Sequence, residues 1–171
     1  MTRPGRHYHY VGPAEMVDLP ASPAAVIVDS PTELANWLAA HGRDGIDEPF
    51  TFVIALDRRL RLAPRRSEHT ALAGGHEVLA AGEMTFARAD AGWHVVAATN
   101  QSTGYCPDSD SWPPVGAALD HLDIAHPGGF TEKITFRLCP SCGERNIVRD
   151  DNFVCALCDS DLPTSWNFTW G

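Results

Sequence analysis

Four cysteines in the C-terminal part of the sequence form two pairs, with two residues between the members of each pair. The first pair is Cys139 and Cys142, and the second is Cys155 and Cys158. Because a C-x-x-C turn points both sulfur atoms at one position, two such turns can place four thiolates around one tetrahedral ion. Four protein ligands leave no coordination position for water or a substrate. The spacing therefore predicts one structural Zn²⁺ per chain.

The sequence around these pairs resembles that of the zinc ribbon family, whose two knuckles have the forms C-P-x-C-G and C-x-x-C. Here Pro140 and Gly143 belong to the first knuckle. The resemblance implies a zinc ribbon over residues 131–171. Two alternatives stay open, a dithiol redox motif and buried cysteines without a metal.

The charge of the expected ribbon argues against nucleic-acid binding, which many zinc ribbons perform. Between positions 133 and 162 the chain has four basic and five acidic side chains, a net charge of −1. Contacts with phosphate groups require a basic surface. We therefore expect the ribbon to stabilise the protein or to dock a protein partner.

A second group of residues with chemical potential lies in the middle of the chain. Five of the 13 lysine and arginine residues fall within nine positions: Arg58, Arg59, Arg61, Arg65 and Arg66. Guanidinium groups bind phosphate or carboxylate as a fork. We expect Arg65 and Arg66 to bind an anionic group, and the alternative is that the cluster is the solvated face of a hairpin.

The stretch H-T-A-L-A-G-G-H-E-V-L-A-A-G starting at His69, together with the later S-T-G-Y-C-P, resembles a segment of plant IQ-motif calmodulin-binding proteins and related bacterial proteins. The matching positions are His69, Gly74, Gly75, Ala80, Ala81, Gly82, Ser102, Gly104, Tyr105 and Pro107. The resemblance implies a shared sheet and pocket, and it implies no activity.

These glycines allow close backbone approaches, so they can bring side chains from distant positions into one cleft. The candidate catalytic residues are His69 as acid or base, with Ser102 and Tyr105 to orient a substrate. The candidate ligand-binding residues are Arg65, Arg66, Gly74, Gly75, Glu83, Asn100 and Thr103. The glycines can equally be turn formers between strands. Cys106 stands alone and is either a nucleophile or, more commonly for a lone cysteine, inert.

The elements that must position these residues follow from hydrophobic periodicity and turn signals. We expect helices over 31–41, where Ser30 supplies an N-cap, and over 114–122. Strands are expected over 8–11, 24–28, 50–56, 76–80, 83–88, 93–99 and 131–138. The strand over 50–56 is expected to form a hairpin with residues 60–62, one face of which is exposed to solvent. The predicted fold is α+β: a mostly antiparallel sheet or partly open barrel with two helices over residues 1–130, followed by the ribbon. The aromatic tail of the ribbon, with Trp166, Phe168 and Trp170, is expected to pack on residues 1–130.

Composition limits the possible partners. The 171 residues carry a formal net charge of −9, which disfavours general binding to nucleic acid or anionic membranes. No apolar run approaches the roughly 20 residues that span a bilayer, and we expect a cytoplasmic protein. The function predicted first is binding of a partner protein or an anionic small molecule through positions 58–105. The alternative is a transferase or hydrolase acting on a phosphate-containing or nucleotide substrate, with His69 as acid or base.

Overall fold

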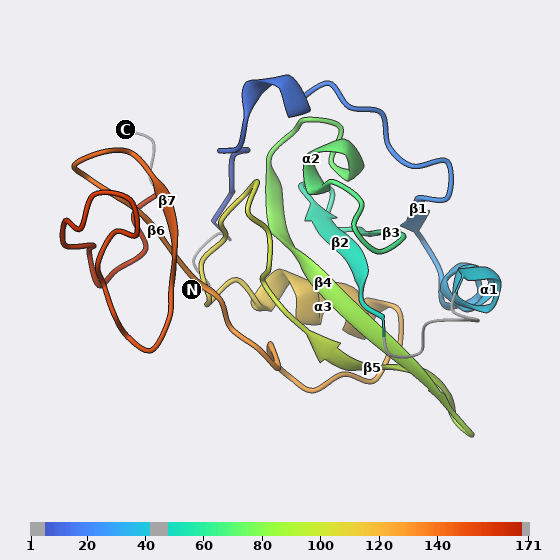
Figure 1. Cartoon of the computed structure of the whole chain (residues 1–171). Helices are drawn as coiled ribbons and strands as arrows, with labels where there is room; N and C mark the ends of the chain where they lie inside the picture. The colour runs from blue at the N-terminus through green and yellow to red at the C-terminus, as the bar shows by residue number, and fades with distance from the viewer. Residues whose placement is uncertain (1–5, 42–47, 169–171) are drawn as a thin grey trace.

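The computed structural model describes residues 6–41 and 48–168, and its larger part is built on a five-stranded antiparallel sheet (Figure 1). The strand order is β1-β3-β2-β4-β5, so the sheet is open and ends at β1 and β5. The strands are β1 (Val26–Val28), β2 (Phe50–Ala55), β3 (Leu60–Ala63), β4 (Val78–Ala89) and β5 (Gly92–Ala98). The predicted α+β class is confirmed, as an open sheet rather than a barrel. We call the part from residue 6 to residue 130 the body.

Three α-helices and a 3-10 turn accompany the sheet in the described part of the chain. They are α1 (Pro31–His41), α2 (His69–Leu72), α3 (Pro113–His121) and the turn η1 (Ala14–Met16). The structure confirms the predicted bounds of α1 and places α3 within one residue of its expected range. Nothing in the sequence analysis anticipated α2, because one helical turn is too short to show a periodicity. None of the helices found between residues 6 and 168 has the length and apolar character needed to cross a membrane.

The two faces of the sheet pack against different elements. On one face, α1 and α3 cover a core that includes Phe52, Leu62 and Met84. On the other face, α2 and the loop around Tyr105 cover a smaller core that includes Val53. Since α2 and α3 both contact β2, all six residues of that strand are buried. The solvent-exposed face predicted for the β2–β3 hairpin is therefore not found in β2, and that prediction is wrong for this strand.

The start of α1 shows why its bounds could be predicted. The Ser30 hydroxyl accepts the Glu33 backbone N–H at 3.1 Å, which satisfies one of the free donors at the helix N-terminus. The Glu33 carboxylate accepts the backbone N–H of Asp29 at 3.3 Å. Further along the helix, the Trp37 indole donates to the Ala24 carbonyl at 2.7 Å and ties the helix to the chain before β1.

One long strand, β4, replaces the two strands expected over 76–80 and 83–88. It stays extended through Gly82, where the strand passes very close to the end of β5. A Cβ atom at Gly82 would lie 1.9 Å from the Thr99 carbonyl oxygen, so only glycine fits there. The strand expected over 8–11 is reduced to a single bridge between Tyr8 and Val78.

The rest of the described chain contains a separate two-stranded sheet. Its strands are β6 (Thr135–Leu138) and β7 (Arg145–Val148), and they appear beside the body in Figure 1. We call residues 134–168 the ribbon. Of the predicted aromatic tail, Trp166 and Phe168 pack in a cluster with Phe136 and Cys106, while Trp170 lies outside the described residues.

Candidate metal centre

The sulfur atoms of the four paired cysteines converge at the end of the ribbon. The Sγ atoms of Cys139 and Cys158 are 3.6 Å apart, and those of Cys142 and Cys155 are 3.7 Å apart. All four sulfurs lie within 4.8 Å of one another. Among the described residues, this is the one group of three or more His, Cys, Asp or Glu side chains that could hold a metal ion. Zn–S bonds of about 2.3 Å in a tetrahedron separate the sulfurs by about 3.8 Å. The cluster therefore has the geometry of a four-thiolate metal site.

Each knuckle closes in the same way, which explains why both C-x-x-C pairs face one point. After the first pair, Gly143 has φ +78° and donates its N–H to the Cys139 carbonyl at 2.9 Å. After the second pair, Asp159 has φ +63° and donates its N–H to the Cys155 carbonyl at 3.0 Å. Glycine and aspartate are among the residues that tolerate this left-handed backbone.

Donors around the Cys155 sulfur favour its thiolate form. Cys155 accepts hydrogen bonds from the Leu157 backbone N–H at 3.4 Å and from the Asn146 side-chain amide at 3.4 Å. Burial raises the pKa of Cys155, but hydrogen bonds from the Cys158 N–H, Asn146 and the Leu157 N–H oppose this, and the pKa falls to about 6. Metal ions bind the thiolate and not the thiol, so these donors prepare the site for a cation.

Asn146 is a functional residue that the sequence analysis missed. Its side chain is buried, and besides the Cys155 sulfur it contacts the backbone of both knuckles. The Asn146 amide donates to the Glu144 carbonyl at 3.1 Å, and its oxygen accepts the Ala156 N–H at 2.9 Å. It therefore orients two metal-binding turns at once. A lone asparagine in β7 gives no sequence signal of this role.

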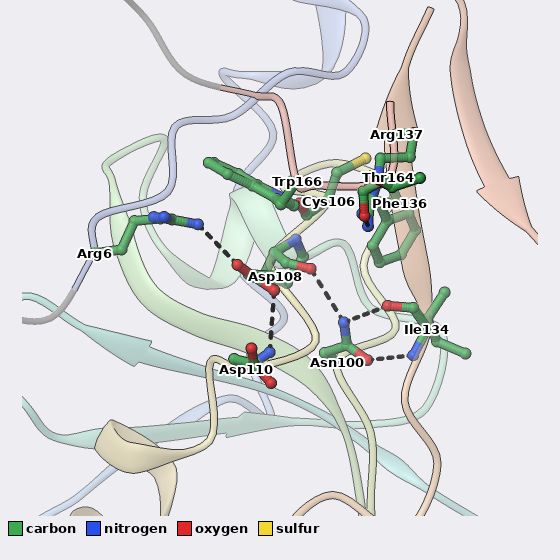
Figure 2. A network of polar contacts seen from close by, with 11 residues as sticks. Arg6, Asn100, Cys106, Asp108, Asp110, Ile134, Phe136, Arg137, Thr164 and Trp166 are labelled. Carbon is green, nitrogen blue, oxygen red and sulfur yellow. Dashed lines mark hydrogen bonds and ion pairs between the residues drawn. The ribbon is translucent and has the colours of Figure 1, made fainter. Parts of the chain in front are cut away.

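The ribbon is attached to the body by a buried polar junction, shown in Figure 2. At its centre, the Asn100 amide donates to the carbonyls of Pro107 at 3.0 Å and Ile134 at 2.8 Å. The Asn100 side-chain oxygen accepts the Ile134 N–H at 2.6 Å. Asn100 was predicted to bind a ligand, and the structure places both ends of its amide on backbone groups instead.

Further contacts extend this junction on both sides. The Trp166 indole donates to the Cys106 carbonyl at 2.7 Å, and Arg145 donates to the Thr103 carbonyl. Arg6 pairs with Asp108 at 2.8 Å, and its guanidinium lies 4.5 Å from the centre of the Trp166 ring (Figure 2). Backbone and side chains of the 100–108 loop thus hold the ribbon.

The predicted catalytic groups bind protein atoms. His69 Nε2 lies 2.8 Å from the Gly82 carbonyl oxygen, and burial lowers the pKa of this histidine to about 4. The Tyr105 hydroxyl donates to the His76 carbonyl at 2.7 Å, and burial raises its pKa to about 12. The Ser102 hydroxyl accepts the Tyr105 backbone N–H at 3.3 Å. Ser102 and Tyr105 therefore lie together, while the ring nitrogen of His69 points to β4.

Gly74 and Gly75, also predicted to bind a ligand, end α2. Both have positive φ, 65° and 76°. The Gly75 N–H donates to the Thr70 carbonyl at 2.8 Å and the Gly74 N–H to the Ala71 carbonyl at 3.1 Å. This pair of bonds is a Schellman cap, so the glycines form the turn from α2 into β4.

Most of the arginine cluster is paired with acidic or carbonyl groups. Arg59 contacts Asp29 and Asp57, each at 2.9 Å, Arg65 contacts Glu48 at 2.7 Å, and Arg61 donates to the Leu72 carbonyl at 3.2 Å. By contrast, the side chains of Arg58 and Arg66 are exposed and form no hydrogen bond or ion pair with another described residue. Arg66 has φ +67° in the turn that joins β3 to α2.

The remaining candidates lie in two separate hollows. Thr103 and Cys106 line a small pocket of about 160 Å³ at the junction between ribbon and body. Burial raises the pKa of the Cys106 thiol to about 12, which keeps it protonated and inert at neutral pH. Glu83 lines a different pocket, on the face of β4.

Comparison of this chain with protein-family models, curated proteins and solved structures gave no match. The resemblance to IQ-motif proteins is therefore not supported by any family, whereas the metal-binding geometry of the four cysteines stands on the structure itself.

Proposed function

We propose that the four cysteines bind one Zn²⁺ and that this ion has a structural role. The observation that carries the proposal is the mutual approach of all four sulfur atoms to within 4.8 Å. A fourfold cysteine site is closed to water and substrate, which suits stabilisation rather than catalysis. A small apolar cluster beside the sulfurs, with Leu162, Val148 and Phe153, is too small to fold this end of the ribbon alone.

Elemental analysis of the purified protein tests the proposal and also its main chemical alternative, an iron ion held by the same four thiolates. We expect one equivalent of zinc per chain and no stoichiometric iron. The Cys142→Ser variant should lose the metal. Cys106→Ser is the matched control, because the Cys106 sulfur faces the Thr103 carbonyl at 3.4 Å and not the cluster. Equal metal loss in both variants, or a metal-free wild type, contradicts the proposal.

We further propose that the protein acts by binding a partner protein or an anionic small molecule through the region from Arg58 to Tyr105. Two exposed guanidinium groups without partners among the described residues, those of Arg58 and Arg66, support an anion contact there. The enzyme alternative has weaker support, because His69 is neutral at physiological pH and is held by a backbone carbonyl.

Thermal unfolding with added inorganic phosphate tests the anion contact. Phosphate should raise the unfolding temperature of the wild type and of Arg88→Ala, an exposed arginine at the far end of β4, but less that of Arg66→Ala. If all three proteins respond alike, the anion contact is wrong and a protein partner remains to be sought by affinity purification.

A further inference from the structure

A pocket of about 400 Å³ opens on the sheet face opposite α1 and α3, where β4 and β5 run beside the segment that leads into the ribbon. Six of its nine lining residues have polar side chains, and the full set is Pro49, Glu83, Thr85, Ala97, Thr99, Gln101, Thr131, Glu132 and Ile134. The floor is continuous, because the bridge between Thr99 and Glu132 places that segment alongside the end of β5. A volume of this size suits a small organic ligand.

The polar side chains reach the pocket because successive residues of β4 and β5 point to opposite faces of the sheet. Met84, Phe86 and Ala98 point into the core beneath α1 and α3. The residues between them therefore point to the opposite face, where Glu83 and Thr85 of β4 lie beside Ala97 of β5 and Thr99, which directly follows β5. The small core under α2 includes Ala81 but none of these four positions, so this end of the face remains open.

Only some of the polar groups in the pocket form hydrogen bonds with other described residues. The Thr99 hydroxyl accepts the backbone N–H groups of Glu83 and Gln101, at 3.3 and 3.1 Å, and the Thr131 hydroxyl bonds to the backbone of Ala98. The side chains of Glu83, Glu132, Gln101 and Thr85 themselves form no hydrogen bond or ion pair with another described residue. The pocket thus presents two carboxylates and few donors of its own.

The described residues compensate the charge of the two carboxylates only in part. Glu83 is half-buried, and burial raises its pKa; Arg65 opposes the rise and the nearby charge of Glu132 adds to it. The Arg65 guanidinium forms its ion pair with Glu48 at 2.7 Å, and no basic side chain of the described residues forms one with Glu83. A positively charged hydrogen-bond donor in the pocket would compensate the negative charge of both carboxylates.

We propose that this pocket binds a small organic ammonium ion, such as a linear diamine or triamine. Ammonium groups supply positive charge to the carboxylates of Glu83 and Glu132, and N–H donors to these carboxylates and to the side-chain carbonyl of Gln101. Pro49, Ala97 and Ile134 provide apolar surface for the methylene chain. A bare metal ion fits less well, because the described residues offer three or more clustered ligands only at the four cysteines. The inference does not depend on the identity of the metal in the ribbon.

Calorimetric titration of the full, metal-loaded chain with 1,4-diaminobutane and with spermidine tests the proposal. We expect saturable binding of one molecule per chain, weakened at least tenfold by Glu83→Gln. Glu132→Gln is the second variant, chosen because its exposed side chain forms no hydrogen bond or ion pair with another described residue, and it should weaken binding in the same direction. Circular dichroism spectra identical to that of the wild type establish that both variants are folded.

Glu15→Gln is the matched control, since it removes the same charge from an exposed position in η1. This control matters because any polyamine is attracted to a chain with a net charge of −9. The proposal predicts that Glu15→Gln binds as the wild type does. Unsaturable heats in the wild type, or equal weakening in Glu15→Gln and Glu83→Gln, would overturn it.

Discussion

Asn100 joins two backbone segments that the sequence separates, the loop at Pro107 and the start of the ribbon at Ile134. A leucine or alanine there would leave the Ile134 N–H and two carbonyls without partners in a buried place. Such unpaired groups each cost about 1–3 kcal/mol. The side chain is therefore a structural requirement of the junction, independent of any ligand.

We expect Asn100→Ala to lower the free energy of unfolding by about 2–4 kcal/mol, because three hydrogen bonds are lost at once. Urea denaturation measures the change. Gln101→Ala is the control: the neighbouring amide is half-exposed and its side chain forms no hydrogen bond with another described residue, so its loss should cost little. A cost for Asn100→Ala no larger than that of Gln101→Ala would show that the junction is not stabilising.

His69 makes the stability of the body depend on pH. Its pKa is about 4 in the folded protein, against 6.5 as its ordinary value, because burial disfavours the charged ring. Between these values the unfolded chain binds more protons than the folded chain, so stability falls as the pH decreases from 6.5 towards 4. The loss is on the order of 1 kcal/mol per pH unit.

His69→Gln keeps a donor for the Gly82 carbonyl and cannot titrate. In urea denaturation at pH 4.5, 5.5 and 7, the difference in stability between the variant and the wild type should shift in favour of the variant as the pH falls. A difference that stays constant over this range would mean that the ring is accessible to protons in the folded state.

At the scale of the element, the second knuckle depends on β7 through Asn146. Since this side chain donates to the Cys155 sulfur and braces both turns, Asn146→Ala should weaken metal binding by about 10–100-fold, as losses of supporting contacts at metal sites do. Competition with a chelator of known affinity measures the effect. Asn152→Ala, on the exposed turn before Cys155, is the control and should bind metal as the wild type does.

The elements that sequence predicted well are those fixed by local signals. The α1 helix has its N-cap, and the cysteine pairs carry their ligand spacing within a few residues. In contrast, the fusion of two expected strands into β4 depends on Gly82 passing the Thr99 carbonyl, which is a contact between strands. The hydrogen bonds between Asn100 and Ile134 join residues 34 positions apart, so no local sequence pattern predicts them. The uncovered face beside Glu83 likewise follows from where α2 ends.

For the whole molecule, the ribbon and the body are coupled through the 100–108 loop. Removal of the proposed zinc ion with a chelator should release β6 and β7, and the loop should loosen with them because Arg145 and Trp166 no longer hold its carbonyls. The central strands β2 and β4 should keep their protection, since their core lies between α1, α2 and α3.

Hydrogen exchange followed by mass spectrometry measures this response. Faster exchange confined to residues 100–108 and 134–168, reversed by added zinc, is the expected result. Loss of protection throughout β2 and β4 would show instead that body and ribbon form one cooperative unit.

The contact between Tyr8 and Trp166 joins positions near the two ends of the described chain, with ring centres 5.4 Å apart. During synthesis on the ribosome, the segment around Tyr8 emerges long before Trp166 exists. If the ribbon folds only with its proposed zinc ion, the bridge from Tyr8 to Val78 stays partly uncovered until the ribbon has been translated and has bound the ion. Supply of the ion during translation, rather than stability alone, then sets how long this edge of the nascent protein stays open to aggregation or to chaperones.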